Sequence, residues 1–135
     1  MKRYLPVVAR ILLGLIFIIM GLNGFFYFIP APKTPMPAEA IAFAMALEKS
    51  GYMNQLVSAT QLIAGILLLL NLFVPLALTV LAPIIVNIIA YHVFLDFNMI
   101  APGIVVTILE LYLAWVYRKA FLPMLAMKVS PNSLT

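Results

Sequence analysis

The chain has 135 residues, of which 66% are hydrophobic and only 9% charged, and its formal net charge is +4. This composition excludes an ordinary soluble domain and indicates an integral membrane protein. The chain has no cysteine, which excludes disulfides, thiolate metal sites and dithiol redox relays.

Four apolar stretches each have about the 20 residues that a helix needs to cross a bilayer. They are residues 5–29, 55–73, 76–95 and 99–117. Residues 37–53 follow a cluster of four prolines and have an amphipathic pattern, which predicts a short interfacial helix between spans one and two, as a plain connection or as a lid. We therefore expect an all-α membrane protein in which residues 1–135 form a single four-transmembrane-helix bundle.

Basic residues gather at both ends of the chain. They are Lys2, Arg3, Arg10, Arg118, Lys119 and Lys128. By the positive-inside rule they predict that both termini are cytoplasmic in a multi-pass protein of the inner (plasma) membrane. Because these cations flank hydrophobic spans and form no patch on a folded face, we do not expect nucleic acid to bind.

Small and polar residues recur at helical spacing in three of the spans, and such stripes allow helices to approach closely. We expect these stripes to face the interior of the bundle. They are Arg10, Gly14, Phe17, Gly21 and Gly24 in the first span, Asn54, Ser58, Gln61, Gly65 and Leu68 in the second, and Gly103, Thr107, Glu110, Ala114 and Tyr117 in the fourth.

Glu110 lies inside the last apolar run, where a carboxylate facing lipid costs roughly 2 to 3 kcal/mol or more. Such a residue usually faces protein or water and often marks a functional site. The alternative is a structural role, in which Glu110 pairs with Arg10 reaching up from the cytoplasmic side. Arg10 could equally extend down to the lipid headgroups.

Polar residues from all four spans fall at similar depth when position is converted at about 1.5 Å per residue. Asn23, Gln61, Asn87, His92 and Glu110 are placed in the middle and outer half of the core. Asn23 and Asn87 could instead only join neighbouring helices, and His92 could anchor the outer interface. Asn87 and His92 are about 140° apart around their helix, so we expect at most one of them to contact a given ligand.

The chain lacks most of the patterns that carry chemistry. A single histidine and no cysteine exclude a two-histidine haem within one chain, and no nucleophile-base triad, Walker loop or metal cluster is present. We therefore expect no metal site, and self-contained catalysis is not predicted.

Several short segments form a recognisable pattern, namely Ala9-Arg10, residues 13–17 (LGLIF), residues 64–68 (AGILL), and residues 82–89 (APIIVNII) with Tyr91-His92. In these segments the chain resembles the DoxX-like family of small four-span membrane proteins. The resemblance implies a four-helix membrane bundle, with some relatives linked to quinone oxidation or to oxidative and thiol stress. Where relatives often carry an acidic residue in early span two, this chain has Gln61, which argues against a proton-carrying role there.

The leading hypothesis is a polar intramembrane pocket that binds a lipophilic molecule such as a quinone. The protein would serve a membrane redox or oxidative-stress complex, for example as a subunit of a quinone-linked oxidoreductase. Its ligand-binding residues would be Glu110, His92, Gln61, Asn87, Asn23 and Arg10. Partners would be the lipid bilayer, redox subunits of the membrane or further copies of the chain. The alternatives are a non-enzymatic scaffold or assembly partner and, third, a small proton-coupled exporter.

Overall fold

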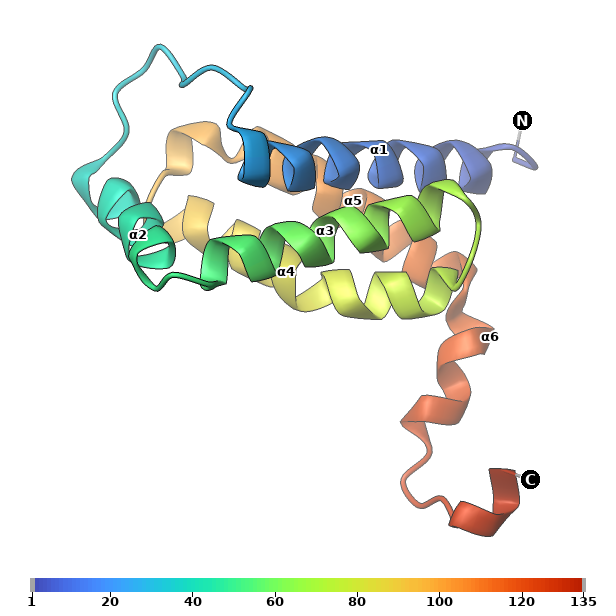
Figure 1. Ribbon diagram of the computed structural model, residues 1–135. Helices are drawn as coiled ribbons and strands as arrows, with labels where there is room; N and C mark the ends of the chain where they lie inside the picture. The colour runs from blue at the N-terminus through green and yellow to red at the C-terminus, as the bar shows by residue number, and fades with distance from the viewer. Residues whose placement is uncertain (1, 135) are drawn as a thin grey trace.

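The computed structural model describes residues 2–134, and this part of the chain is helical without strands. The elements in order are α1 (Leu5–Phe26), α2 (Ala38–Lys49), α3 (Met53–Leu69), α4 (Val74–Phe94), the short 3₁₀ helix η1 (Phe97–Met99), α5 (Ala101–Val116), α6 (Arg118–Phe121), η2 (Leu122–Leu125) and η3 (Pro131–Leu134). In Figure 1 the helices α1, α3, α4 and α5 lie side by side, and α2 crosses one end of them. The N-terminus, the α3–α4 turn and the start of α6 lie at the opposite end.

Two of the helices are long and apolar enough to cross a membrane alone, namely α1 with 22 residues and α4 with 21. Helices α2 and α3 pass the same test only as a pair, and they are bent by 89° at the break between them. Helix α5 is apolar but has only 16 residues, which span about 24 Å against a core of about 30 Å. The chain is thus a helical protein with clear membrane-spanning segments.

Residues in the left-handed backbone region follow the ends of α1, α2 and α3. Helix α1 stops at Phe26, short of residue 29, because Tyr27 has φ 50° and its N–H bonds back to the carbonyl of Asn23. Asn71 and Phe73, with φ 58° and 49°, form the tight turn between α3 and α4. Gly51, with φ 84°, follows the end of α2, where glycine adopts this conformation without a Cβ penalty.

The predicted inward stripes of α1 and α3 are buried. Arg10, Gly14, Phe17 and Gly21 are the buried members in α1, and Ser58, Gln61, Gly65 and Leu68 those in α3. In α5 the stripe is buried at Gly103 and Glu110. Glycine brings α1 and α3 together so closely that a Cβ on Gly21 would lie 2.8 Å from the carbonyl oxygen of Ser58. This close backbone contact between α1 and α3 fixes the rotation of α3 about its axis, and that rotation sets the direction of the Gln61 side chain.

Candidate functional site

Gln61 of α3 and Asn87 of α4 line the same cavity, which has a volume of about 400 Å³. Their neighbours there include Val57, Pro83 and Ile84. The cavity therefore has apolar walls and two carboxamide groups, the composition expected of a site for a small lipophilic molecule. Its volume also falls within the range of about 300 to 1,000 Å³ that such sites have.

Helix α2 closes one end of this cavity through the apolar side of the amphipathic pattern. Phe43 and Leu47 of α2 line the cavity together with Gln61 and Asn87. The ring of Phe43 packs against Tyr91 of α4, with 5.6 Å between the ring centroids. Helix α2 is thus part of the wall of the cavity, a contact that amphipathicity alone could not predict.

The two carboxamides have unused hydrogen-bonding capacity. Gln61 is only 6% exposed, whereas Asn87 is exposed, and neither side chain hydrogen-bonds to another group in residues 2–134. Each amide NH₂ has two donors to offer a carbonyl oxygen, and each amide oxygen can accept from a hydroxyl.

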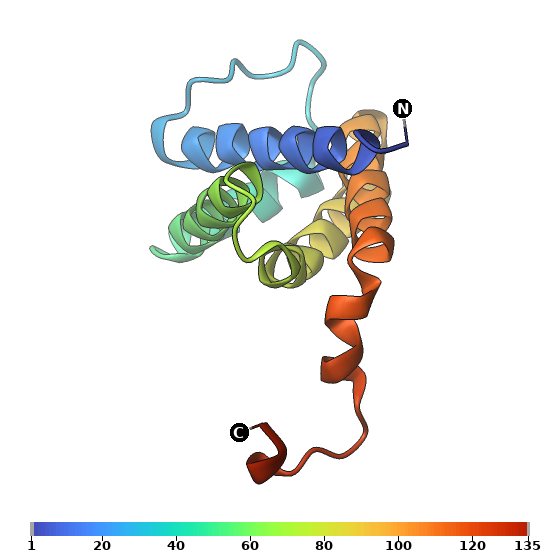
Figure 2. The same ribbon diagram turned by 90° about the vertical axis from the view of Figure 1, so that its right-hand side faces the viewer.

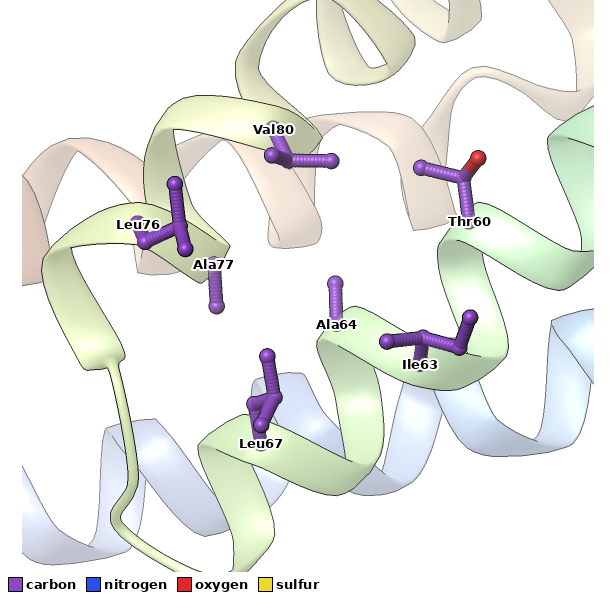
Figure 3. A pocket seen from close by; sticks show the side chains of 7 residues that line it. All are labelled: Thr60, Ile63, Ala64, Leu67, Leu76, Ala77 and Val80. Atoms are coloured by element: carbon purple, nitrogen blue, oxygen red, sulfur yellow. The ribbon is translucent and has the colours of Figure 1, made fainter.

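A second, apolar cavity of about 260 Å³ lies further along the contact between α3 and α4 (Figure 3). Side chains from both helices point toward one another across it. Its one hydroxyl, on Thr60, is used within α3 because it donates to the carbonyl of Leu56 at 2.8 Å. This cavity can accommodate apolar chains but has no free polar group with which to orient a head group.

The two cavities follow one stripe of α3. Met53 and Val57 line the first cavity, and Thr60, Ala64 and Leu67 line the second. Their spacing of four, three, four and three residues keeps all five on one side of the helix. The stripe is about 21 Å long at 1.5 Å per residue. The two cavities are therefore successive levels of one seam, polar near α2 and apolar toward the α3–α4 turn.

Glu110 does not join this site. It lines a different cavity, of about 260 Å³, between α4 and α5, together with Thr107 and Ile85. Glu110 is 7% exposed, and its Oε2 atom is buried without a hydrogen-bond partner in the described chain. Glu110 therefore lies in the interior, as its stripe predicts, but it does not share a cavity with Gln61.

His92 lines a fourth cavity, of about 220 Å³, with Ile16 and Met20 of α1 and Gly103 of α5. Its Nδ1 bonds to the carbonyl oxygen of Ile88 at 2.8 Å. Because a carbonyl can only accept, Nδ1 is the donor and Nε2 is the free nitrogen. Asn87 and His92 thus line different cavities, as their separation around the helix predicts.

Arg10 makes contacts other than the two that the sequence suggested. The guanidinium is 8% exposed and donates from Nη1 to the carbonyl oxygens of Leu68 and Leu69, the latter at 3.1 Å. The last carbonyls of a helix lack partners within the helix and carry partial negative charge. Arg10 therefore caps the end of α3 and neither pairs with Glu110 nor extends to the headgroups.

Asn23 holds the loop after α1 and does not line any of these cavities. Its Oδ1 accepts a hydrogen bond from the N–H of Ile29 at 2.8 Å. Beside it, Asn54 donates to the hydroxyl of Tyr27 at 3.1 Å, and that hydroxyl donates to Glu48 at 3.3 Å. Desolvation and the negative charge of Glu48 raise the pKa of Tyr27 above its usual value. These contacts join α1, α2 and α3 at one end.

The candidate residues are therefore divided among separate environments. Gln61 and Asn87 share one cavity, Glu110 and His92 each line another, and Arg10 and Asn23 hold the backbone. Sequence reasoning missed Phe43 and Leu47 as lining residues, although their place on the apolar side of the interfacial segment was a usable signal. In the described chain no group of three or more histidine, aspartate or glutamate side chains could hold a metal ion.

The apolar helices and the buried polar side chains within them define a helical integral membrane protein. The sequence model of the DoxX family matches residues 5–95, which is most of the chain, and the protein belongs to that family. The match runs from α1 through α4 and includes Gln61 and Asn87, whereas Glu110 lies beyond it. No curated protein and no solved structure matches the chain.

Proposed function

We propose that this DoxX-family protein binds a lipophilic molecule with a carbonyl-bearing head and an apolar tail, such as an isoprenoid quinone, in the seam between α3 and α4. The observation that carries the proposal is the pair of carboxamides, Gln61 and Asn87, which have no protein partner and line one otherwise apolar cavity. The amide donors would hold the carbonyl oxygens of the head group.

The second cavity in the seam supports a ligand with a tail. It continues the same stripe of α3 past Thr60 toward Leu67, and its lining is apolar. Ile63 and Leu76 on its rim are 60% and 56% exposed, so a chain lying there would remain in contact with the surrounding hydrocarbon. A tail-bearing molecule could thus reach the site sideways from the bilayer.

The role that we propose is binding and presentation of the quinone to a redox complex of the inner membrane, with both termini in the cytoplasm. The arrangement of the chain supports this orientation, because the N-terminus and the start of the basic C-terminal segment lie at the same end of the helices (Figure 1). The head-group cavity lies at the other end, under α2. Electron transfer would then require cofactors held by partner subunits.

The experiment is a titration of the purified protein in lipid nanodiscs with decylubiquinone, followed by thermal unfolding. We expect a ligand-dependent rise in Tm for the wild type. Gln61→Leu combined with Asn87→Leu should weaken binding about tenfold or more, since each lost hydrogen bond contributes about 0.5–1.5 kcal/mol. Gln61 has no hydrogen-bond partner within residues 2–134 and Asn87 is exposed, so replacing both by an apolar group of similar size should leave the ligand-free protein folded.

Thr60→Val is the matched control. It removes a polar atom from the same seam, but that hydroxyl is already used within α3. We expect wild-type affinity for this variant. The proposal is wrong if decylubiquinone leaves the Tm of the wild type unchanged, or if the double variant binds as tightly as the wild type.

A second candidate function is that of a non-enzymatic assembly partner. Residues 118–134 project away from the other helices (Figure 2), and they expose Leu125 and Met127, the latter at 95%. An exposed apolar segment of this kind fits docking to another membrane subunit or to another copy of the chain. Removing residues 122–135 should then reduce the size of the native complex in membrane extracts while quinone binding is retained.

A further inference from the structure

Glu110 is a buried acidic group that the proposed quinone site does not use. Its side chain faces the cavity of about 260 Å³ between α4 and α5, and its Oε2 has no hydrogen-bond partner among the described residues. Leaving a buried carboxylate without a partner is costly. An occupant of this cavity that satisfies the carboxylate would therefore gain a strong interaction.

The rest of the cavity offers little else that is polar. The other lining residues are Ala82, Ile85, Val86, Ile89, Thr107 and Leu111. The hydroxyl of Thr107 donates to the carbonyl of Gly103 at 2.7 Å, so only its oxygen lone pair remains free, as an acceptor. An ionised carboxylate is also an acceptor only, and Thr107 lies one turn from Glu110 on the same side of α5.

The described part of the chain supplies no cation to this place. Arg10, the one basic residue buried in the helices among residues 2–132, donates to the carbonyls at the end of α3. Glu110 makes no ion pair or hydrogen bond within residues 2–134. With Glu110 ionised, the site has acceptors and no donors, so it selects a head group that has donors and a positive charge. A primary ammonium has three donors and no acceptor, and its charge favours the ionised carboxylate.

The opening of the cavity determines what else the occupant must carry. Val86 and Leu111, which line it from α4 and α5, are 69% and 65% exposed. On a membrane-spanning surface these side chains contact the hydrocarbon, so the cavity opens sideways to the lipid and not to water. An occupant that enters this way must be mostly apolar.

We propose that this cavity is a binding site for a lipophilic primary amine. Its ammonium group would contact Glu110 and Thr107, and its apolar chain would leave between α4 and α5. The site is separate from the quinone site, because Gln61 and Asn87 line a different cavity, and either proposal can fail without the other.

The test compares dodecylamine with dodecanol, which has the same chain and an uncharged head, on the protein in zwitterionic nanodiscs at pH 7. We expect dodecylamine to raise the Tm at concentrations at which dodecanol does not. Glu110→Gln should weaken amine binding about tenfold or more, because it removes the charge from a charge-assisted hydrogen bond while keeping the size of the side chain. Thr107→Val should weaken amine binding by a smaller factor, since it removes one neutral acceptor.

Gln61→Leu, in the other cavity, is the control and should bind dodecylamine as the wild type does. Equal stabilisation by dodecanol would overturn the proposal, and so would full retention of amine binding in Glu110→Gln. The comparison of the two head groups on the wild type needs no variant, so it decides even if Glu110→Gln fails to fold. Dihexanoyl phosphatidylethanolamine carries the same ammonium beside a phosphate, for which the cavity has no donor, so we expect no rise in Tm with this lipid. A rise would contradict a cavity that offers acceptors alone.

Discussion

Gly14 of α1 and Gly65 of α3 face each other with their backbones in contact. A Cβ on Gly14 would lie 2.9 Å from the carbonyl oxygen of Gly65, and a Cβ on Gly65 would lie 2.8 Å from that of Gly14. Backbones approach this closely only where neither residue has a side chain. The pair fixes the distance and rotation of α3 against α1, and so turns Gln61 toward α4.

Gly65→Ala should therefore destabilise the protein by about 1–3 kcal/mol, the usual cost of inserting a methyl group into a close-packed contact. Thermal unfolding in detergent measures the effect as a lower Tm. Gly103→Ala is the control, because its added Cβ would meet only side-chain atoms, the nearest of them 3.3 Å away at Ile88. Equal decreases of the Tm in Gly65→Ala and Gly103→Ala would contradict the close backbone contact between α1 and α3.

Arg10→Met should destabilise the protein by about 1.5–3 kcal/mol, since it removes charged hydrogen bonds and leaves the carbonyl of Leu69 without its side-chain donor, while the carbonyl of Leu68 keeps the N–H of Asn71 at 3.2 Å. Arg118→Met is the matched control. Arg118 also donates to a carbonyl, that of Trp115 at 2.8 Å, but at an exposed position, so its loss should be within about 0.5 kcal/mol. If Arg10 stabilised the protein only through an ion pair with Glu110, adding Glu110→Gln to Arg10→Met would restore the stability. We do not expect this restoration.

Asn23→Ala should loosen the loop that follows α1, because the N–H of Ile29 loses its acceptor. The measurement is the rate of limited trypsin cleavage after Lys33 in the purified protein, which should rise severalfold. Asn23→Asp keeps an oxygen at the same position and should retain the slow rate. Unchanged cleavage in Asn23→Ala would show that this hydrogen bond does not hold the loop.

The proposed orientation is testable with single cysteines, because the natural chain has none. A membrane-impermeant maleimide should label Lys33→Cys in intact spheroplasts. Lys128→Cys should react only after the membrane is permeabilised. The reverse pattern would place the termini outside and would contradict the positive-inside prediction.

Val80→Trp should separate the tail from the head of the proposed ligand. Val80 lines the apolar cavity between α3 and α4 and is 38% exposed, so a larger side chain can fill the cavity without entering the core. We expect weaker binding of decylubiquinone, by about tenfold, and little change for a benzoquinone without a tail. If both ligands lose affinity equally, the tail does not lie in this cavity.

Much of the helical pattern was predictable, because it depends on properties of neighbouring residues. Hydropathy identified the apolar helices, and helical spacing identified the inward stripes that hold Gly14, Gln61 and Glu110. Helix ends were less predictable, since α1 stops at Phe26 through the left-handed conformation of Tyr27, which apolar composition does not report. The conversion of helix position to depth grouped Gln61, Glu110 and His92 at one level, although these side chains line different cavities.

The sequence by itself determined that this is a helical membrane protein of the DoxX type, with a buried carboxyl in its last long helix, because hydropathy and spacing are local properties. Only the tertiary structure decided which polar residues meet. Which polar residues meet depends on how the helices are rotated and on which helices are neighbours. Here the contact between Gly14 of α1 and Gly65 of α3 sets the rotation of α3. In the resulting arrangement Gln61 and Asn87 line one cavity, and Arg10 donates to the carbonyls at the end of α3. Glu110 lines a separate cavity.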